Sequence, residues 1–255
     1  MFRLIDTHCH VTCDSLFDHI DEIIEKAQKE NIERMLIICT NLEEYERADQ
    51  LKIQHPNLFD IALGFHPNDL YEVKESDFKR LEELLEEDKL IAVGEIGLDY
   101  HWDDVKPADQ IQGFIRQLEL AKKYDKPVLI HMREATQDTL DVLDKYSGHK
   151  GIIHCFSGSV EVAKQFVKMG FYISFGGPLT FKNSRHAPAV AEAIGLEHIF
   201  VETDSPYLTP HPYRGKQNEP SYVRYTFEKL CEIKNVDRKM AAEQLRENYK
   251  KLFNV

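Results

Sequence analysis

The sequence predicts an α/β protein built as a (β/α)8 TIM-type barrel with an additional helix at its C-terminal end. Two observations support this fold class. Eight short apolar runs alternate with amphipathic stretches, and they recur at roughly 30-residue spacing, as the strand–helix units of a barrel do. No linker rich in Pro, Gly or Ser and no block of charge interrupts the series, so we expect residues 1–255 to form a single domain.

The predicted strands are mostly near-continuous runs of β-branched or aliphatic residues. The run Val128-Leu129-Ile130 is an example, and such runs are typical of parallel strands that are covered on both faces. The eight predicted strands span residues 4–7, 35–40, 59–65, 90–96, 127–131, 151–156, 171–175 and 198–202. A doubly wound open sheet is the alternative, but no glycine-rich G-x-G-x-x-G sequence follows the first strand.

Amphipathic helices are predicted between the strands. Residues 16–29, 78–87 and 114–123 carry apolar side chains every three or four positions, and we expect these stripes to pack against the strands. Beyond the eighth strand, residues 221–253 predict two helices divided near residues 235–237, where Asp237 is a candidate N-cap.

Composition and charge narrow the classes of function. The chain is 42% hydrophobic, which is enough for a full core, and no apolar run approaches the ~20 residues of a membrane helix. Five cysteines without C-x-x-C spacing and the lack of a signal-peptide pattern predict a cytoplasmic protein with reduced thiols. The net charge of −12 argues against a protein that coats nucleic acid, although an enzyme could still bind a few phosphates in a cleft.

The clearest functional signal is the run Asp6-Thr7-His8-Cys9-His10 at the end of the first strand. Residues two apart on a strand project from the same face, so His8 and His10 are expected to point together while Cys9 points away. Two neighbouring imidazoles are suitable ligands for a divalent metal ion. The pair alone is a weak signal, because many H-x-H sequences are ordinary surface or core histidines.

Four further candidate ligands follow at the ends of later strands. Glu95 closes the fourth predicted strand, His131 ends the fifth, His154 ends the sixth, and Asp204 follows the eighth. The C-terminal ends of barrel strands meet on one face, where barrel enzymes place their active sites, so all six side chains are expected to converge there.

Six imidazole and carboxylate ligands exceed what one open catalytic metal usually takes. Two divalent ions about 3.5–4 Å apart are therefore the simplest arrangement, with Glu95 as the bridge because the fourth strand lies across the barrel from the first. Asp204 is expected to bind one ion and to orient the attacking water or accept its proton. The donor set suits Zn, Mn, Co, Ni or Fe better than Ca.

Two further carboxylates are predicted to lie beneath the ligands. Glu202 shares the strand face of Asp204, and Asp6 shares that of His8. A buried carboxylate without a partner is costly, so we expect both to be hydrogen-bond partners of the ligand groups.

Five segments, taken in order, resemble the signature sequences of TatD-type metal-dependent deoxyribonucleases, which belong to the amidohydrolase-like barrels. They are DTHCH (6–10), GFHP (64–67), GEIGLDY (94–100), HCFSG (154–158) and ETDSP (202–206). The resemblance extends over nearly the whole chain and implies a two-metal hydrolase of phosphodiester bonds. The ligands that it implies are the six already named: His8, His10, Glu95, His131, His154 and Asp204. Glu95 stands where many related amidohydrolases use a carbamylated lysine.

The resemblance also implies DNA as the substrate, single-stranded or at frayed ends, and two divalent ions among Mg, Mn, Zn, Ni and Co. No membrane association and no obligate protein partner is expected. Side chains that could contact substrate phosphates are Arg133, His66, Arg214 and Lys216. The segment 214–220 departs from the family pattern at Gln217, where a second arginine is usual, so one cation is missing there.

Two alternatives remain open. The same metal pair could hydrolyse an amide or ester of a small molecule, or an aminoacyl ester of RNA, because the ligands do not distinguish these bonds from a phosphodiester. A non-enzymatic barrel would instead hold coordinatively saturated ions and depend on them for stability.

Overall fold

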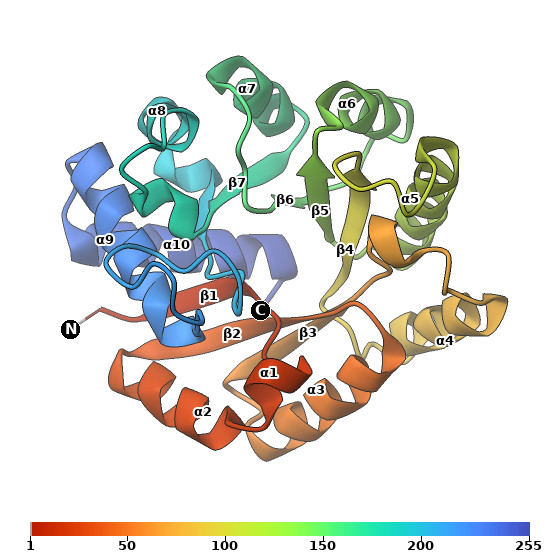
Figure 1. Cartoon of the computed structure of the whole chain (residues 1–255), viewed down its shortest axis with the longest axis horizontal. Helices are drawn as coiled ribbons and strands as arrows, with labels where there is room; N and C mark the ends of the chain where they lie inside the picture. Colours follow the sequence, from red (N-terminus) through yellow and green to blue (C-terminus); the bar gives the residue numbers. More distant parts are fainter. Residues whose placement is uncertain (1) are drawn as a thin grey trace.

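The computed structural model describes residues 2–255, and its eight parallel strands form one sheet that closes into a barrel (Figure 1). The strands follow one another around the sheet in chain order. The two end strands meet where Thr7 Oγ1 donates a 3.0 Å hydrogen bond to the Val201 carbonyl, and where Cys9 forms a bridge with Ser205. The predicted TIM-type barrel is therefore confirmed.

The strands lie close to their predicted positions, with differences at their ends. They are β1 (Leu4–Cys9), β2 (Ile32–Cys39), β3 (Phe59–Leu63), β4 (Ala92–Asp99), β5 (Val128–Arg133), β6 (Gly151–Ile153), β7 (Phe171–Phe175) and β8 (Ile199–Val201).

Helices cover the outside of the barrel, and Figure 1 shows them as a ring around the strands. They are α1 (Asp14–Phe17), α2 (Ile20–Lys29), α3 (Leu42–Gln54), α4 (Glu75–Glu86), α5 (Pro107–Lys123), α6 (Thr136–Lys145), α7 (Val160–Lys168), α8 (His186–Ala193), α9 (Val223–Lys234) and α10 (Arg238–Phe253). Short 3-10 turns are η1 (Pro67–Asp69), η2 (Gly177–Thr180), η3 (Leu196–His198) and η4 (Pro220–Tyr222). No helix within residues 2–255 is long and apolar enough to cross a membrane.

Several predicted boundaries differ from the structure, and β5, which ends at Arg133, carries His131 within it instead of at its end. The helix expected over residues 16–29 is divided into α1 and α2, with Asp18 and His19 between them. Strand β4 continues to Asp99, so Glu95 lies within the strand instead of closing it. Gly97 permits this extension, because a Cβ there would lie 2.0 Å from the carbonyl oxygen of His131 on β5.

The C-terminal helix closes the end of the barrel opposite to the strand C-termini. Tyr249, Leu252 and Phe253 of α10 pack against inward-facing apolar side chains from seven strands, β2 to β8. In Figure 1 α10 crosses behind the strands. Its N-cap is Asp237, whose side chain accepts a hydrogen bond from the backbone N–H of Met240, as the sequence predicted. The end of the barrel at the strand C-termini is not covered by α10 and is available for a site.

A buried carboxylate ties α10 to the barrel wall. Asp60 on β3 is 3% exposed and lies 2.7 Å from the Arg34 guanidinium, 3.1 Å from Lys52 Nζ and 2.8 Å from the Tyr249 hydroxyl, which donates to it. Burial alone would raise the pKa of Asp60, but the hydrogen bond from Arg34 and the charge of Lys52 lower it below its ordinary value of 3.8.

Replacing Asp60 with asparagine should lower the free energy of unfolding by about 2 kcal/mol at neutral pH, because two cations lose the negative charge that pairs with them and one of the two acceptor oxygens becomes an amide donor. A carboxylate whose pKa is lowered by folding stabilises the fold above its unfolded pKa and loses this contribution as the pH falls. Urea unfolding of both proteins should therefore show the difference shrinking below about pH 4. A difference that stays constant down to about pH 2 would contradict this account.

Candidate metal centre and active site

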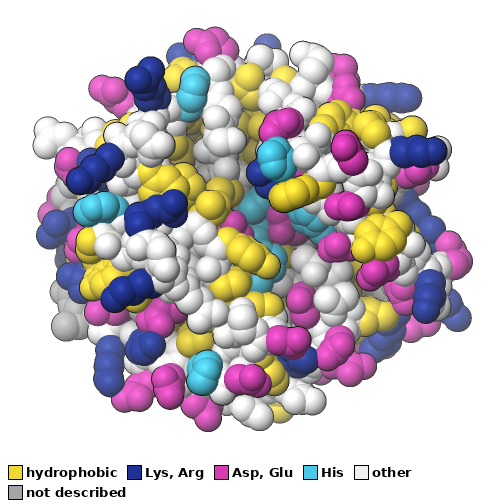
Figure 2. Space-filling model, in the orientation of Figure 1, with side chains coloured by type: hydrophobic (Ala, Val, Ile, Leu, Met, Phe, Trp, Pro, Cys, Tyr) yellow, Lys and Arg dark blue, Asp and Glu magenta, His cyan; other side chains and the backbone are white. Residues whose placement is uncertain are grey.

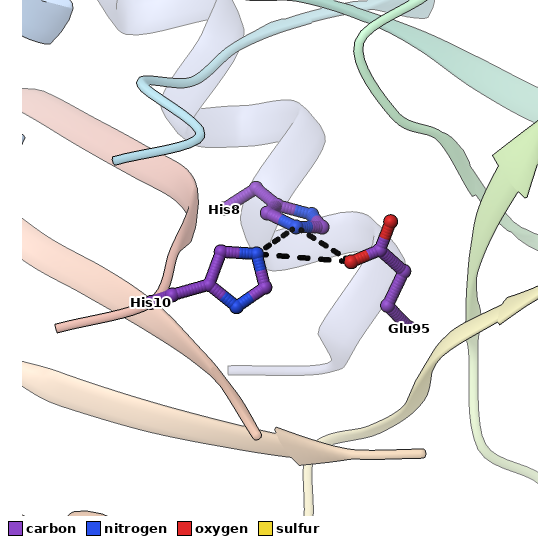
Figure 3. A group of neighbouring side chains, drawn as sticks. All are labelled: His8, His10 and Glu95. Atoms are coloured by element: carbon purple, nitrogen blue, oxygen red, sulfur yellow. Dashed lines mark hydrogen bonds and ion pairs between the residues drawn. The ribbon is translucent and has the colours of Figure 1, made fainter. Parts of the chain in front are cut away.

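The two carboxylate oxygens of Glu95 face two different groups of side chains at the C-terminal end of the strands. Oε2 lies 3.4 Å from His8 Nε2 and 3.7 Å from His10 Nε2, and these two nitrogens are 3.2 Å apart (Figure 3). Asp204 completes this group, with Oδ1 3.5 Å from His10 Nε2 and 3.8 Å from His8 Nε2.

The other oxygen of Glu95 faces a second pair of histidines. Oε1 lies 2.7 Å from His131 Nδ1 and 2.7 Å from His154 Nε2, and those nitrogens are 3.3 Å apart. The six predicted ligands are thus brought together by β1, β4, β5 and the segments that follow β6 and β8. Figure 2 shows histidine side chains gathered in a hollow near the middle of this face.

Backbone hydrogen bonds fix Asp204 against β1. Its N–H donates to the His8 carbonyl at 2.9 Å, and the next residue, Ser205, accepts from the His10 N–H at 2.8 Å. Asp204 adopts a left-handed conformation with φ of 56°. This conformation turns the chain directly after β8, and aspartate tolerates it better than most residues do.

Glu202 contacts the side chain of the predicted ligand His154, whereas within residues 2–255 Asp6 contacts no side chain of a predicted ligand. Oε1 of Glu202 lies 3.3 Å from His154 Nδ1 and accepts a 2.7 Å hydrogen bond from the Cys155 N–H. Asp6 accepts instead from the N–H and hydroxyl of Thr203, at 2.9 and 2.6 Å, and from the backbone N–H of His8. It therefore joins β1 to the segment that leads to Asp204.

Asp99 is a further residue of the site that the sequence reasoning missed. Its Oδ2 lies 3.0 Å from His131 Nε2 and accepts from the Asn68 amide at 3.2 Å, while Oδ1 accepts from the His101 N–H at 2.9 Å. It thus holds His131 from the side away from Glu95. Its spacing was the available signal, because a residue four after Glu95 on a continuing strand projects from the same face.

Burial and the neighbouring imidazoles control the charges of the site. Burial alone would raise the pKa of Glu95, but the charge of His154 and hydrogen bonds from His131 and His154 lower it well below its ordinary value. Burial lowers the pKa of His8, and His154 lowers it further. Burial also lowers the pKa of His66 to about 4, so its ring is neutral at physiological pH.

The donor set fits divalent metal ions. Within residues 2–255, every ion-pair partner of Glu95 and Asp204 is a histidine, and no lysine or arginine neutralises either carboxylate. Three clusters around Glu95 and His131 bring ligand atoms within 4.8 Å of one another: His8/His10/Glu95, Glu95/His131/His154 and His66/Asp99/His131. Buried imidazole nitrogens that face one another and carboxylate oxygens are typical ligands of zinc, manganese, nickel or cobalt.

A cleft of about 690 Å³ opens beside the predicted ligands. His131, His154 and Asp204 line its inner end, and its walls are largely apolar, with contributions from Met132, Phe156, Phe175, Leu179 and Leu208. Arg133 and Arg185 also line it. The cleft lies on the side of the β5 to β8 loops, so a substrate seated in it would reach the side chains around Glu95 from that side.

The structure brings only two of the four predicted phosphate contacts close to the centre. His66 Nε2 lies 3.9 Å from Glu95 Oε1, and Arg133 lines the cleft with its guanidinium 5.8 Å from the Trp102 ring centre. The other two do not line this cleft: Arg214 lies 3.9 Å over the Phe181 ring, and Lys216 lies 5.4 Å from the Tyr213 ring.

Gln217 does not face the cleft either. Its side-chain amide donates a 3.1 Å hydrogen bond to the Ser15 carbonyl, so it ties the late loop to α1.

Several known proteins resemble this chain over nearly its whole length. The metal-dependent hydrolase YabD of Bacillus subtilis (strain 168), named as uncharacterized, is 40% identical over 254 residues, which cover 99% of each chain. The similarly named YcfH of Escherichia coli (strain K12) is 34% identical, over 99% of this chain and 96% of that protein. The crystal structure of YjjV, a TatD homologue from E. coli K12, superposes with a TM-score of 0.94 at 30% identity, over 99% of this chain and 98% of that one.

A hydrolase of the TatD family from Entamoeba histolytica has the same fold, with a TM-score of 0.87 at 23% identity over 99% of this chain and 98% of that one. The model of the family described as TatD related DNase matches residues 5–254. Together with the barrel and its histidine and carboxylate clusters, these matches show that the chain belongs to the TatD family of metal-dependent hydrolases.

Proposed function

We propose that this protein hydrolyses phosphodiester bonds of DNA with a pair of divalent metal ions held at Glu95. The observation that carries the proposal is the division of the Glu95 carboxylate, because its two oxygens face separate groups of histidine nitrogens. His8, His10 and Asp204 would hold one ion, and His131 and His154 the other. The family description, TatD related DNase, supports DNA as the substrate.

Divalent ions bound there would polarise a phosphate oxygen and lower the pKa of a bound water. Asp204 lies at the inner end of the cleft, beside His10, with a pKa that stays below its ordinary value although burial alone would raise it. It is therefore ionised and can accept the proton of the attacking water, and it can later return that proton to the leaving oxygen. Glu95 would supply the negative charge that holds the ions, and it does not need to move a proton.

Side chains around the cleft would position the substrate. Arg133 is exposed at the cleft wall, on the strand that carries His131, and its planar guanidinium suits a phosphate with two oxygens available. His66, neutral at physiological pH, can donate a hydrogen bond beside Glu95. Asp99 and Glu202 would hold His131 and His154 in a fixed orientation through their remaining ring nitrogens.

The test is hydrolysis of single-stranded DNA by metal-stripped protein, before and after Mg²⁺, Mn²⁺ or Zn²⁺ is restored. We expect cleavage only after metal is restored, and none by a folded His131→Ala variant. His149→Ala is a matched control, because His149 is a buried histidine that lies before β6, away from the strand C-termini. Cleavage that survives metal removal, or full activity of His131→Ala, would contradict the proposal.

An esterase or amidase acting on a small molecule is a second candidate, because the cleft walls are largely apolar. It predicts turnover of a carboxylic ester or amide by the metal-loaded protein and no cleavage of any phosphodiester. An aminoacyl ester of RNA belongs to the same test, since its ester bond would break while the RNA strand stays intact.

Replacing Glu202 with glutamine should weaken metal binding about 10- to 100-fold, because the acceptor beside His154 Nδ1 loses its charge. Isothermal titration calorimetry, in which metal is added to the stripped variant, measures the metal affinity directly. Unchanged metal affinity would show that the Glu202 carboxylate has no part in orienting His154.

A further inference from the structure

Two segments at the C-terminal end of the barrel contain no acidic residue. Residues 176–191 and 205–218 carry neither Asp nor Glu, although the chain has 44 such residues among 255. The same segments carry four basic side chains, Lys182, Arg185, Arg214 and Lys216, in a protein whose net charge is −12. We call residues 176–191, which include η2 and most of α8, and residues 205–218 the two carboxylate-free loops.

The two carboxylate-free loops pack together into one rim of the cleft. The His211 N–H donates a 2.8 Å hydrogen bond to the Thr180 hydroxyl, and Arg214 stacks 3.9 Å over the Phe181 ring. Gly177 lies so close to the second loop that a Cβ there would be 1.9 Å from the Leu208 carbonyl oxygen. The four cations are consequently presented by one continuous surface.

All four cations are exposed, and none forms an ion pair with a carboxylate anywhere in residues 2–255. Their charges are therefore available to a ligand. Arg185 lines the cleft together with His154 and Asp204, so the basic surface begins at the metal-binding side chains and extends outward.

The opposite rim has the reverse charge. Exposed carboxylates follow β3 and β4 there, namely Asp69, Glu72, Asp103 and Asp104. Figure 2 shows acidic side chains to the right of the histidine-lined hollow, on the side where Figure 1 places α4 and α5, and dark blue side chains to its left. A polyanion that crosses the site is attracted to one rim and repelled by the other.

We propose that a phosphodiester-linked strand extends from the metal centre over the two carboxylate-free loops, with its phosphates on Lys182, Arg185, Arg214 and Lys216. This inference rests on the proposed function and adds to it the path of the strand and two residues, Lys182 and Arg185. Contacts to phosphate do not distinguish DNA from RNA. The loops therefore bind the length of a strand, whereas the cleft binds the bond that is cleaved.

The test measures strand binding apart from turnover. In the metal-loaded Asp204→Asn background, which keeps the strand intact, fluorescence anisotropy gives the Kd of labelled single-stranded DNA of about three and about 12 nucleotides. Reversing two charges with Lys182→Glu and Arg185→Glu should raise the Kd of the longer strand at least about tenfold. The slope of log K against log salt concentration should become shallower by about 1.4, which is the value expected when two phosphate contacts to a single strand are lost.

Three comparisons make the result specific. Lys164→Glu with Lys168→Glu on the exposed face of α7 changes the net charge equally and should leave the Kd nearly unchanged. Lys182→Arg with Arg185→Lys keeps both charges and should bind as the parent does. RNA of the same sequence should lose affinity in the same proportion as DNA, and a peptide nucleic acid with a neutral backbone should show no difference between the proteins.

Equal Kd values for the parent and the Lys182→Glu, Arg185→Glu protein would overturn the inference, as would an equal loss in the α7 control. Hydrolysis of bis(para-nitrophenyl) phosphate by the wild-type protein tests the proposed function separately. If this small diester is cleaved and the reversed loops bind normally, only the inference fails. If no diester is cleaved and the reversed loops lose affinity for the strand, only the proposed function fails.

Discussion

Replacing Glu95 with glutamine should reduce metal-dependent hydrolysis about a thousandfold or more and remove most of the bound metal. The variant keeps the shape of the side chain but loses the charge that faces His8 and His10 through one oxygen and His131 and His154 through the other. Four neighbouring imidazoles would then lack the anion between them. The rate of phosphodiester turnover measures the loss of hydrolysis, and the metal content determined by mass spectrometry measures the loss of bound metal.

Glu44→Gln is the matched control for this variant. Glu44 is a half-buried glutamate at the same end of the barrel, where it accepts a 2.9 Å hydrogen bond from the Thr40 N–H. Within residues 2–255 it forms no hydrogen bond or ion pair with any of the six proposed ligands, so the loss of its charge should change turnover by no more than about tenfold. A Glu95→Gln protein that keeps two ions and normal turnover would rule out the bridging role.

The architecture was predictable because each strand carries its own signal. A run such as Val128-Leu129-Ile130 is apolar on both faces, as a strand between a filled interior and a helix layer must be. The length of β4 was less predictable. The predicted strand ends at residue 96, directly before Gly97, but in the structure Gly97 allows close approach to β5, and the strand continues to Asp99.

The convergence of the six proposed ligands on one face was also predictable, because the C-terminal ends of parallel strands meet there. Their roles as metal ligands stay a prediction. Asp99 was missed because it seemed to lie beyond the end of its strand, although its contact with His131 follows from the real length of β4.

The positions of loop cations depend on contacts that the sequence does not encode locally. Arg214 and Lys216 were predicted to contact substrate phosphates, and in the structure they lie beside the Phe181 and Tyr213 rings, outside the lining of the cleft. Lys182 and Arg185 belong to none of the sequence motifs, so no role was predicted for them. The absence of acidic residues over two separate segments was the available signal, and its meaning emerges only when the fold packs the segments together.

Replacing Asp204 with asparagine should lower kcat about 10²- to 10⁴-fold at neutral pH while metal content and KM change little. Asparagine keeps an oxygen that can bind a metal ion, but it cannot accept the proton of the attacking water. It also tolerates the left-handed backbone of this position, whose φ is 56°, so the fold is not strained by the change. Single-turnover kinetics on a phosphodiester separate this chemical effect from substrate binding.

Asp204→Ala is the informative comparison, because alanine removes the oxygen as well as the charge and pays about 1 kcal/mol for the left-handed backbone. It should therefore lose bound metal and some stability in addition to turnover. If Asp204→Asn retains full kcat while Asp204→Ala loses metal, Asp204 acts only as a ligand, and proton transfer must pass to another group. If both variants keep the metals and full kcat, Asp204 has no part in the chemistry, and the proposed mechanism is wrong.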